Sequence, residues 1–284
     1  MRESTAAHWD RYWRERENID EVYSNEQRVL SQVGDLELAG RRVLEVGAGS
    51  GRDSIELARS GAVVFLLDYV ASSFTVVRTV AKEAGQTVFC VCGDATRMPF
   101  RDGAFRLVFH QGLMEHFRDP RPLLSENLRA TEPGGYCLID VPQRYHPYTL
   151  AKHAMIAMNR WFAGWETEFS PGSLSRVVRE AGFGVVRIGG DWMVPGFWYR
   201  SLRYGLMRAR VARLPKYPPG IPGLSALQRR AREWLRRRRV GPYTFAMVSV
   251  LARRPLVDGA RVEDARGEGT RGDGARDEGA RKGR

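Results

Sequence analysis

Residues 43–51 have the composition of a ligand-binding turn. They read Val-Leu-Glu-Val-Gly-Ala-Gly-Ser-Gly, a short apolar run that ends in three glycines at every second position. This run, followed by the helix-compatible residues 52–59, predicts a strand, a tight turn and a helix. Glycine allows positive φ and has no Cβ to hold a ligand away, and the helix that follows offers unpaired N–H groups at its start. The pattern therefore predicts that a nucleotide-like ligand lies directly on the main chain of this turn.

Acidic residues stand at the ends of the next two apolar runs. Asp68 closes the second run, and Asp94 follows the third. Asp68 comes 19 residues after Gly49, close to the ~20-residue spacing at which an acid accepts both ribose hydroxyls in nucleotide-binding α/β folds. A dinucleotide fingerprint is missing, because the place of its third glycine holds Arg52. The spacing favours a nucleoside ligand and disfavours NAD.

Apolar runs and helix-compatible stretches alternate through most of the chain. The predicted strands cover residues 42–47, 62–68, 87–92, 105–109, 136–141, 184–188 and 243–251. A Pro-Gly-Gly turn at 133–135 is expected before the fifth strand, and Ser170 with Pro171 is expected to begin a helix. Such alternation with nearly continuous apolar strands implies right-handed crossovers and a parallel sheet that is covered on both faces.

The glycine turn, Asp68 and the triplet Gly93-Asp94-Ala95 together resemble the class I S-adenosylmethionine-dependent methyltransferases. Within that class the chain is similar to the methyltransferase type 11 group, which includes small-molecule and quinone methyltransferases. The resemblance covers roughly residues 40–190 and a last strand near 243–254. It implies a Rossmann-like α/β fold with a seven-stranded, mostly parallel sheet, an antiparallel seventh strand, and S-adenosylmethionine as the cofactor.

The same resemblance assigns residues to the cofactor. They are Glu45, Gly47, Ala48, Gly49, Gly51, Asp68, Tyr69, Asp94, Ala95 and Gln111. It implies that Glu45 lies near the methionine or ribose part, that Asp94 accepts the adenine amine, and that Gln111 faces the methionine end. Arg52 has two open interpretations, a partner for the methionine carboxylate or a surface ion pair.

Methyl transfer from a sulfonium depends on in-line placement of the acceptor more than on acid–base groups. An acceptor that is a hydroxyl or a carbon acid also needs a base, for which the candidates are His116, His110, Glu115 and His146. Glu115 and His116 are the best placed, and His116 is the candidate catalytic residue. The alternative is that this pair only shapes the pocket.

The chain is expected to divide into four parts. Residues 1–35 form an N-terminal helical lid, in which Trp9 and Tyr12 either close the site or pack a helix onto the sheet. Residues 36–190 and 242–255 form the methyltransferase core, and residues 191–241 form a helical basic insertion before the last strand. Residues 256–284, rich in Gly, Arg and acids, are expected to be a disordered tail.

Composition limits the compartment and the metal chemistry. No stretch of 18 apolar residues occurs, and the first residues lack an apolar leader, so a cytoplasmic protein is expected. Cys90, Cys92 and Cys137 all fall in predicted buried strands. They are interpreted as core thiols, and no metal site is expected.

The net charge of +12 belongs to one segment, since residues 187–241 contain fourteen Arg or Lys and two acids. A helical arrangement of residues 224–235 places Leu224, Leu227, Ala231, Trp234 and Leu235 on one face and arginines on the other. The composition of residues 192–239 therefore predicts peripheral contact with the inner membrane surface. The alternative is an ordinary cap helix with a solvated outer face.

The predicted function is methyl transfer to a small-molecule acceptor that is hydrophobic or lipid-linked. Aromatic and methionine residues concentrated in residues 143–168 suit such an acceptor, although a dry interface inside the protein would have the same composition. An RNA methyltransferase is a competing hypothesis because the isoelectric point is about 10.1, but no RNA-binding module is recognisable, which disfavours nucleic acid as a partner. A non-catalytic nucleotide-binding scaffold is the third hypothesis.

Overall fold

The computed structural model describes residues 5–15, 28–161, 163–220 and 222–256. One seven-stranded sheet has the order β3-β2-β1-β4-β5-β7-β6. The strands are β1 (Arg42–Val46), β2 (Val63–Asp68), β3 (Phe89–Cys92), β4 (Phe105–Gln111), β5 (Thr131–Pro142), β6 (Gly184–Asp191) and β7 (Met247–Arg253). The first five are parallel, and β7 is antiparallel to both β5 and β6. The predicted fold class is confirmed, including the direction of the last strand.

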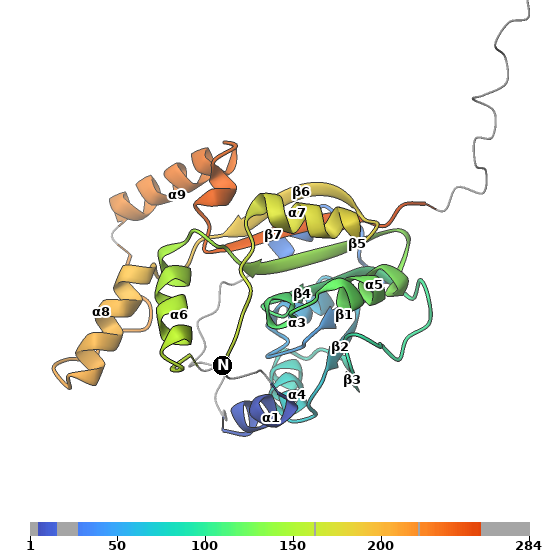
Figure 1. Cartoon of the computed structure of the whole chain (residues 1–284), viewed down its shortest axis with the longest axis horizontal. Coiled ribbons are helices and arrows are strands. Elements are labelled where there is room, and N and C mark those ends of the chain that lie inside the picture. Colours follow the sequence, from blue (N-terminus) through green and yellow to red (C-terminus); the bar gives the residue numbers. More distant parts are fainter. Residues whose placement is uncertain (1–4, 16–27, 162, 221, 257–284) are drawn as a thin grey trace, which may run out of the picture.

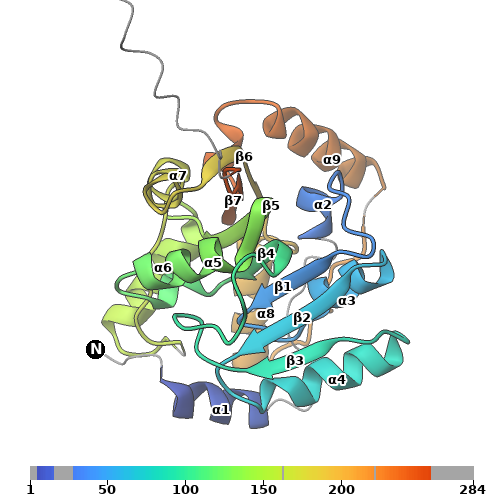
Figure 2. The ribbon, with the colours of Figure 1, turned by 90° about the vertical axis from the view of Figure 1, so that its right-hand side faces the viewer.

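Helices cover both faces of the sheet (Figures 1 and 2). The helices are α1 (Ala6–Arg14), α2 (Leu30–Val33), α3 (Arg52–Arg59), α4 (Ser73–Glu83), α5 (Arg121–Ala130), α6 (Pro147–Ala157), α7 (Pro171–Glu180), α8 (Phe197–Arg208) and α9 (Pro222–Arg236), with short 3₁₀ turns η2 (Met114–His116) and η3 (Gly241–Tyr243). Buried residues of α2, α3 and α4 join the core on one face, and those of α5 and α7 join it on the other. This burial on both faces explains why the parallel strands are almost continuously apolar.

Local signals set several helix boundaries where they were expected. The Ser170 hydroxyl accepts the N–H of Ser173 at 3.1 Å, and Pro171 occupies the first helical position of α7.

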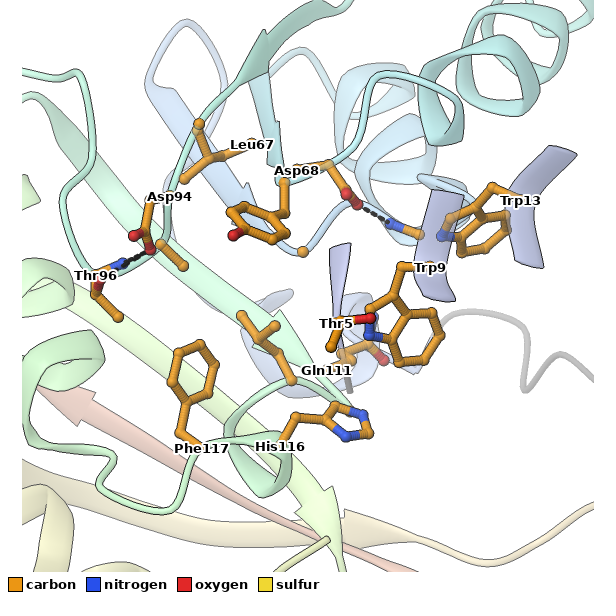
Figure 3. Close-up of a pocket in the computed structure, with 17 residues that line it drawn as sticks. Thr5, Trp9, Trp13, Leu67, Asp68, Asp94, Thr96, Gln111, His116 and Phe117 are labelled. Carbon is orange, nitrogen blue, oxygen red and sulfur yellow. Dashed lines mark hydrogen bonds between the residues drawn. The ribbon is translucent and has the colours of Figure 1, made fainter. Parts of the chain in front are cut away.

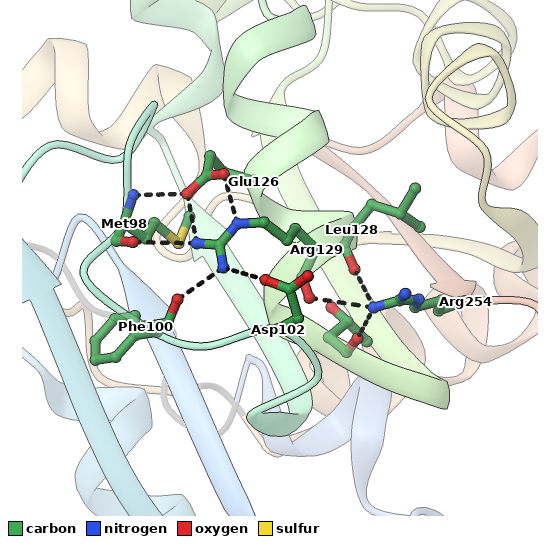
Figure 4. A network of polar contacts seen from close by, with 8 residues as sticks. Met98, Phe100, Asp102, Glu126, Leu128, Arg129 and Arg254 are labelled. Carbon is green, nitrogen blue, oxygen red and sulfur yellow. Dashed lines mark hydrogen bonds and ion pairs between the residues drawn. The ribbon is translucent and has the colours of Figure 1, made fainter.

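Figure 4 shows how α5 is held at its C-terminal end. The Arg129 guanidinium donates to Glu126 at 2.7 Å, to Asp102 at 2.7 Å and to two carbonyls of the loop that precedes β4. These contacts tie that loop to the helix.

The largest errors in the predicted strand boundaries are at the starts of the fifth and the last strands. The Pro-Gly-Gly sequence at 133–135 lies within β5, because pairing to β4 already begins at Thr131 and resumes after a bulge at Tyr136. Residues 243–246 precede the last strand, which begins at Met247. Pro242 fits the start of a short helix, and the Thr244 hydroxyl accepts from the Trp192 indole at 3.1 Å, so this stretch turns before it enters the sheet.

The prediction of three buried cysteines is wrong for two of them. Cys137 is buried in the interior strand β5, but Cys90 is half-buried and Cys92 is exposed. Both lie on β3, which is an edge strand of the sheet. An edge strand keeps one side open to solvent, and strand order is not visible in the apolar pattern of a single strand.

The N-terminal residues divide between two places. Helix α1 lies against α4, with Ser72 donating to the Asp10 carbonyl at 3.5 Å, whereas Val29 and Val33 are fully buried in the sheet core. Helices α8 and α9 both lie on the left in Figure 1, one below the other. Most of the expected tail, with residues 1–4 and 16–27 of the expected lid, lies outside the described residues.

Candidate active site

A cavity of about 520 Å³ opens at the C-terminal ends of β1, β2, β3 and β4 (Figure 3). Its walls come from the turn after β1, the residues that follow β2 and β3, the loop from β4 into η2, and one face of α1. A cavity between 300 and 1,000 Å³ is typical of small-molecule sites. Parallel strands place their turns at one edge of the sheet, which explains why segments 60 residues apart meet here.

The glycine turn forms one wall of the cavity. Gly47 and Gly49 both line it, with φ of +74° and +49°. The N–H of Gly47 donates to the Leu67 carbonyl at 2.8 Å, and that of Gly49 donates to Asp68 Oδ2 at 3.3 Å. A Cβ on Gly47 would lie 3.1 Å from the Leu113 side chain. The turn is thus held against β2 in a conformation that glycine adopts without strain.

The two acids expected at the nucleoside also line the cavity. Asp68 is mostly buried and accepts the Val70 N–H at 3.0 Å. Burial raises the pKa of Asp68, while its backbone hydrogen bonds oppose that rise. Asp94 uses Oδ1 to accept both the N–H and the hydroxyl of Thr96 at 2.8 Å. Tyr69 and Ala95 line the cavity beside them.

Gln111 lines the cavity with its amide already oriented. Its Nε2 donates to Asp53 Oδ2 at 2.8 Å, and Asp53 Oδ1 accepts the Val29 N–H at 3.1 Å. This chain of bonds connects β4, α3 and the residue before α2. The position of Gln111 is therefore set by contacts outside the cavity.

Three residues expected at the cofactor lie outside the lining. The Glu45 carboxyl is buried and accepts the Ser54 hydroxyl at 2.6 Å, and burial raises its pKa well above the usual range. Ala48 is buried. Gly51, in the left-handed region, packs so closely that a Cβ would lie 3.0 Å from Leu66. Contact of these three residues with the cofactor stays a prediction.

Helix α1 supplies an aromatic wall. Thr5, just before the helix, and Trp9 and Trp13 within it line the cavity, while the ring of Tyr12 packs edge-on against both tryptophans. Of the two expected aromatics, Trp9 lines the cavity and Tyr12 supports it from behind. The spacing of four residues from Thr5 to Trp9 to Trp13 places them on one helical face, and this signal could have identified Trp13.

Of the four candidate bases, only His116 lines the cavity. Its ring lies edge-on to Trp9, with centroids 5.4 Å apart. Burial lowers the pKa of His116, so its imidazole is neutral near pH 7. His110 is fully buried, and burial lowers its pKa to about 3. His146 caps α6 by accepting the Tyr148 N–H at 3.2 Å.

The polar and apolar parts of the cavity suit S-adenosylmethionine and an apolar acceptor. Asp68 and Asp94 offer carboxylates at two strand ends, and Leu113, Phe117 and the two tryptophans supply the apolar surface. Residues 143–168 were expected at the acceptor, but those of them that the structure describes do not line this cavity. Among the described residues, no group of three or more His, Cys, Asp or Glu is arranged to hold a metal ion.

Known proteins resemble this chain in sequence and in fold. The model of the methyltransferase domain family, type 11, matches residues 44–139. A demethylmenaquinone methyltransferase from Renibacterium salmoninarum is 36% identical over 112 residues, which are 39% of this chain and 44% of that protein. One from Mycobacterium bovis is 33% identical over 130 residues, which are 46% and 47% of the two chains. The chain thus spans about half the length of the curated relatives it matches.

A SAM-dependent methyltransferase from Methanosarcina mazei has the same fold, with a TM-score of 0.53 at 14% identity over 80% of this chain and 97% of that one. The architecture and the position of the cavity define an α/β protein with the class I methyltransferase fold. Within this fold, residues 44–139 match the type 11 methyltransferase domain family.

Proposed function

We propose that this protein is an S-adenosylmethionine-dependent methyltransferase with a hydrophobic, quinone-like acceptor. The observation that carries the proposal is the composition of one cavity. Its polar side holds the glycine turn and two strand-end acids, and its opposite side holds Trp9, Phe117 and His116. The cavity therefore offers surface to a cofactor and to an apolar acceptor side by side.

The proposed chemistry is an in-line displacement. When bound, S-adenosylmethionine supplies an electrophilic methyl group on a sulfonium. Asp68 and Asp94 would hold the nucleoside through charge-assisted hydrogen bonds. Helix α1 would exclude water from the reacting atoms, and His116 would face the acceptor as a neutral imidazole. Orientation alone supplies ~7 to 11 kcal/mol of barrier reduction in well-placed reactions.

The acceptor class is proposed from the relatives together with the apolar side of the cavity. Both curated relatives are named as demethylmenaquinone methyltransferases. A reduced quinone is an electron-rich aromatic ring that a methyl cation equivalent can attack at carbon or oxygen. Leu113, Phe117 and Trp9 offer flat apolar surface to such a ring.

Calorimetry and a transfer assay test this proposal. S-adenosylmethionine and its demethylated product are each titrated into the protein and are expected to bind with similar affinity, since the named contacts engage the adenosine and amino-acid parts. Tritiated S-adenosylmethionine is then supplied with a short-chain demethylmenaquinone reduced by dithionite. Label is expected in the organic phase. Binding of NADH in place of either ligand would overturn the proposal.

The transfer assay also separates the competing functions. Transfer RNA is supplied in a parallel reaction, because a basic isoelectric point alone favours an RNA substrate. Label in RNA and none in the quinone would support an RNA methyltransferase. Tight binding of S-adenosylmethionine with no label in any cell fraction would support a scaffold without catalysis.

We further propose that residues 192–239 contact the inner, anionic surface of a membrane. Thirteen of these residues are Arg or Lys and one is Glu. Large apolar side chains in the segment are exposed instead of packed: Trp198 by 75%, Leu227 by 64% and Trp234 by 56%. An ordinary cap helix would bury the apolar face of α9, so this exposure supports the membrane interpretation. None of the described helices is long and apolar enough to span a bilayer.

Vesicle co-sedimentation tests the contact. The protein is expected to pellet with phosphatidylglycerol vesicles, to remain in solution with phosphatidylcholine vesicles, and to be released by salt. Replacement of the four arginines at 236–239 by Gln is expected to weaken pelleting, since each basic residue near an anionic surface contributes ~1 kcal/mol. Equal pelleting with both vesicle types, together with salt-sensitive binding to transfer RNA, would contradict this proposal.

A further inference from the structure

A group of buried charged side chains lies behind η2, outside the cavity. The Lys152 side chain is fully buried, and its Nζ lies 2.5 Å from Glu166 Oε2 and 3.1 Å from Glu168 Oε1. The Trp161 indole donates to the other oxygen of Glu166 at 2.6 Å. Glu168 also contacts Nε2 of the half-exposed His153 at 2.5 Å. Lys152 therefore forms ion pairs with two buried carboxylates.

This group lies directly beside the loop that carries His116. The Thr167 N–H donates to the Glu115 carbonyl at 2.8 Å, so the segment containing Glu166 runs along η2. Glu115 is itself buried, and its Oε2 has no hydrogen-bond partner among the described residues. The Nδ1 atom of His116 is likewise buried and without a partner in that part of the chain. His116 thus lines the cavity from a turn whose backbone is hydrogen-bonded to the segment that carries Glu166.

The charged groups around His116 act on it in opposite directions. Burial lowers the pKa of His116 most strongly. Glu166 and a hydrogen bond with the Gly112 backbone raise this pKa, while the charges of Lys152 and His8 lower it. Burial, together with Glu166, raises the pKa of Glu115 well above the usual range, which favours the uncharged form of Glu115. Glu166 is therefore the carboxylate that favours a positive charge on the imidazole.

We propose that Glu166 is a positioning residue for methyl transfer, whose buried carboxylate stabilises the imidazolium that His116 becomes on accepting the acceptor's proton. This inference rests on the proposed function. In the transfer step the acceptor's hydroxyl or ring proton moves to His116, and the acceptor's electron pair forms a bond to the methyl carbon. The carbon–sulfur bond breaks with its electron pair on sulfur, which leaves a neutral thioether and one proton on the imidazole.

The charge balance of the buried group supports this role. Glu166 and Glu168 share the ammonium of Lys152, and His153 contacts only Glu168, so Glu166 has no second cationic partner in this group. Negative charge in a region of low dielectric costs free energy while it is uncompensated. A cation forming next to Glu166 relieves that cost. The arrangement resembles the general use of a buried carboxylate to stabilise a catalytic imidazolium.

The first test measures the imidazole itself and needs neither cofactor nor acceptor. The chain has five histidines, and the NMR signal of His116 is assigned as the one lost in His116→Gln. Glu166→Gln keeps the hydrogen-bonding shape and removes the charge, so it is expected to lower the pKa of His116. The matched control is Glu168→Gln, which removes the other carboxylate of Lys152 and is expected to leave that pKa unchanged.

The second test measures the turnover of reduced short-chain demethylmenaquinone against pH. In the wild-type enzyme kcat is expected to rise with pH, because the base acts in its neutral form. Glu166→Gln is expected to shift this rise to lower pH. It is also expected to lower the plateau, by at most about tenfold for each unit by which the His116 pKa falls, because a weaker base accepts the proton more slowly. The KM for S-adenosylmethionine and its calorimetric affinity are expected to stay the same.

A double variant separates the proposed role from a structural one. In a His116→Gln background, Glu166→Gln is expected to cause no further loss of kcat. An equal loss in both backgrounds, or an unchanged His116 pKa in Glu166→Gln, overturns the inference. If Glu166→Gln does not fold, Glu166→Asp is used in its place. The shorter side chain moves the carboxylate away, so a smaller fall of the His116 pKa is expected. An unchanged His116 pKa in this variant overturns the inference. Inactivity of the wild-type enzyme with an intact NMR response would instead count against the proposed function.

Discussion

Two regions of this molecule are proposed to bind a ligand, and they are built differently. The first is the glycine turn with its neighbouring strand ends, and the second is the basic segment at residues 192–239. In the first, backbone N–H groups and buried acids are held by hydrogen bonds from neighbouring strands, as in the contact of Gly49 with Asp68. In the second, aromatic and basic side chains extend from α8 and α9 into solvent. Binding at the first depends on fixed backbone geometry, and binding at the second on exposed area and charge.

The largest expected effect comes from breaking the backbone geometry. Gly49→Val places a branched side chain at φ of +49°, with its Cβ 3.6 Å from the Trp13 ring. Backbone strain in the turn and the space that the valine side chain takes from the ligand are expected to weaken S-adenosylmethionine binding by about a hundredfold or more. Calorimetry measures the loss. The matched control in the second region is Gly205→Val, because a Cβ on Gly205 meets nothing within 4 Å, and unchanged affinity is expected there.

A smaller loss is expected when one acceptor is weakened in the same region. Asp68→Asn removes the negative charge that supports Gly49 and would hold the ribose. Loss of a hydrogen bond to a charged acceptor costs about 1.5 to 3 kcal/mol, or about ten- to a hundredfold in affinity. Asp102→Asn, on the loop held by Arg129, is the control and should leave the affinity unchanged. Equal affinities of the wild type and Asp68→Asn would refute the ribose assignment.

In the basic segment a single aromatic side chain is expected to contribute to membrane binding through its apolar surface area. Trp198→Ala removes the most exposed large aromatic of α8. If that ring enters the lipid interface, affinity for phosphatidylglycerol vesicles should fall by about tenfold, with S-adenosylmethionine binding unaffected. Tyr145→Ala, which removes an exposed aromatic outside the segment, should leave vesicle binding as it is. Similar losses in both variants would mean that the contact is not confined to the segment.

The last expected effect lies outside both regions and concerns the pH dependence of stability. Burial raises the pKa of Asp140 to about 6 despite its ion pair with Arg28. The unfolded chain ionises first, so the free energy of unfolding should fall as pH rises from about 4 to about 6, by about 2 to 3 kcal/mol. Asp140→Asn should remove this part of the decline in urea titrations at several pH values. Trp198→Ala, which removes no titratable group, should keep it.

Predictions from sequence were most accurate where a local signal decides the structure. Alternating glycines after an apolar run predict the turn at 47–51, because few other conformations satisfy its backbone. The spacing of Asp68 and Asp94 behind their strands likewise placed both acids in the cavity lining. The exposure of Cys92 and the burial of the Glu45 carboxyl behind the lining were not predicted, because both depend on neighbours from other strands.

The sequence by itself determined the strand–turn–helix unit, the acids at the strand ends and the confinement of the net charge to one segment, since each depends on residues close together in the chain. Only the tertiary structure decided that His116 lines the cavity while His110 is buried, and that Glu166 and Lys152 lie behind His116. These relations depend on strand order and on which side of η2 the segment at 165–169 passes. Both are set by packing between elements distant in sequence, and no local pattern encodes them.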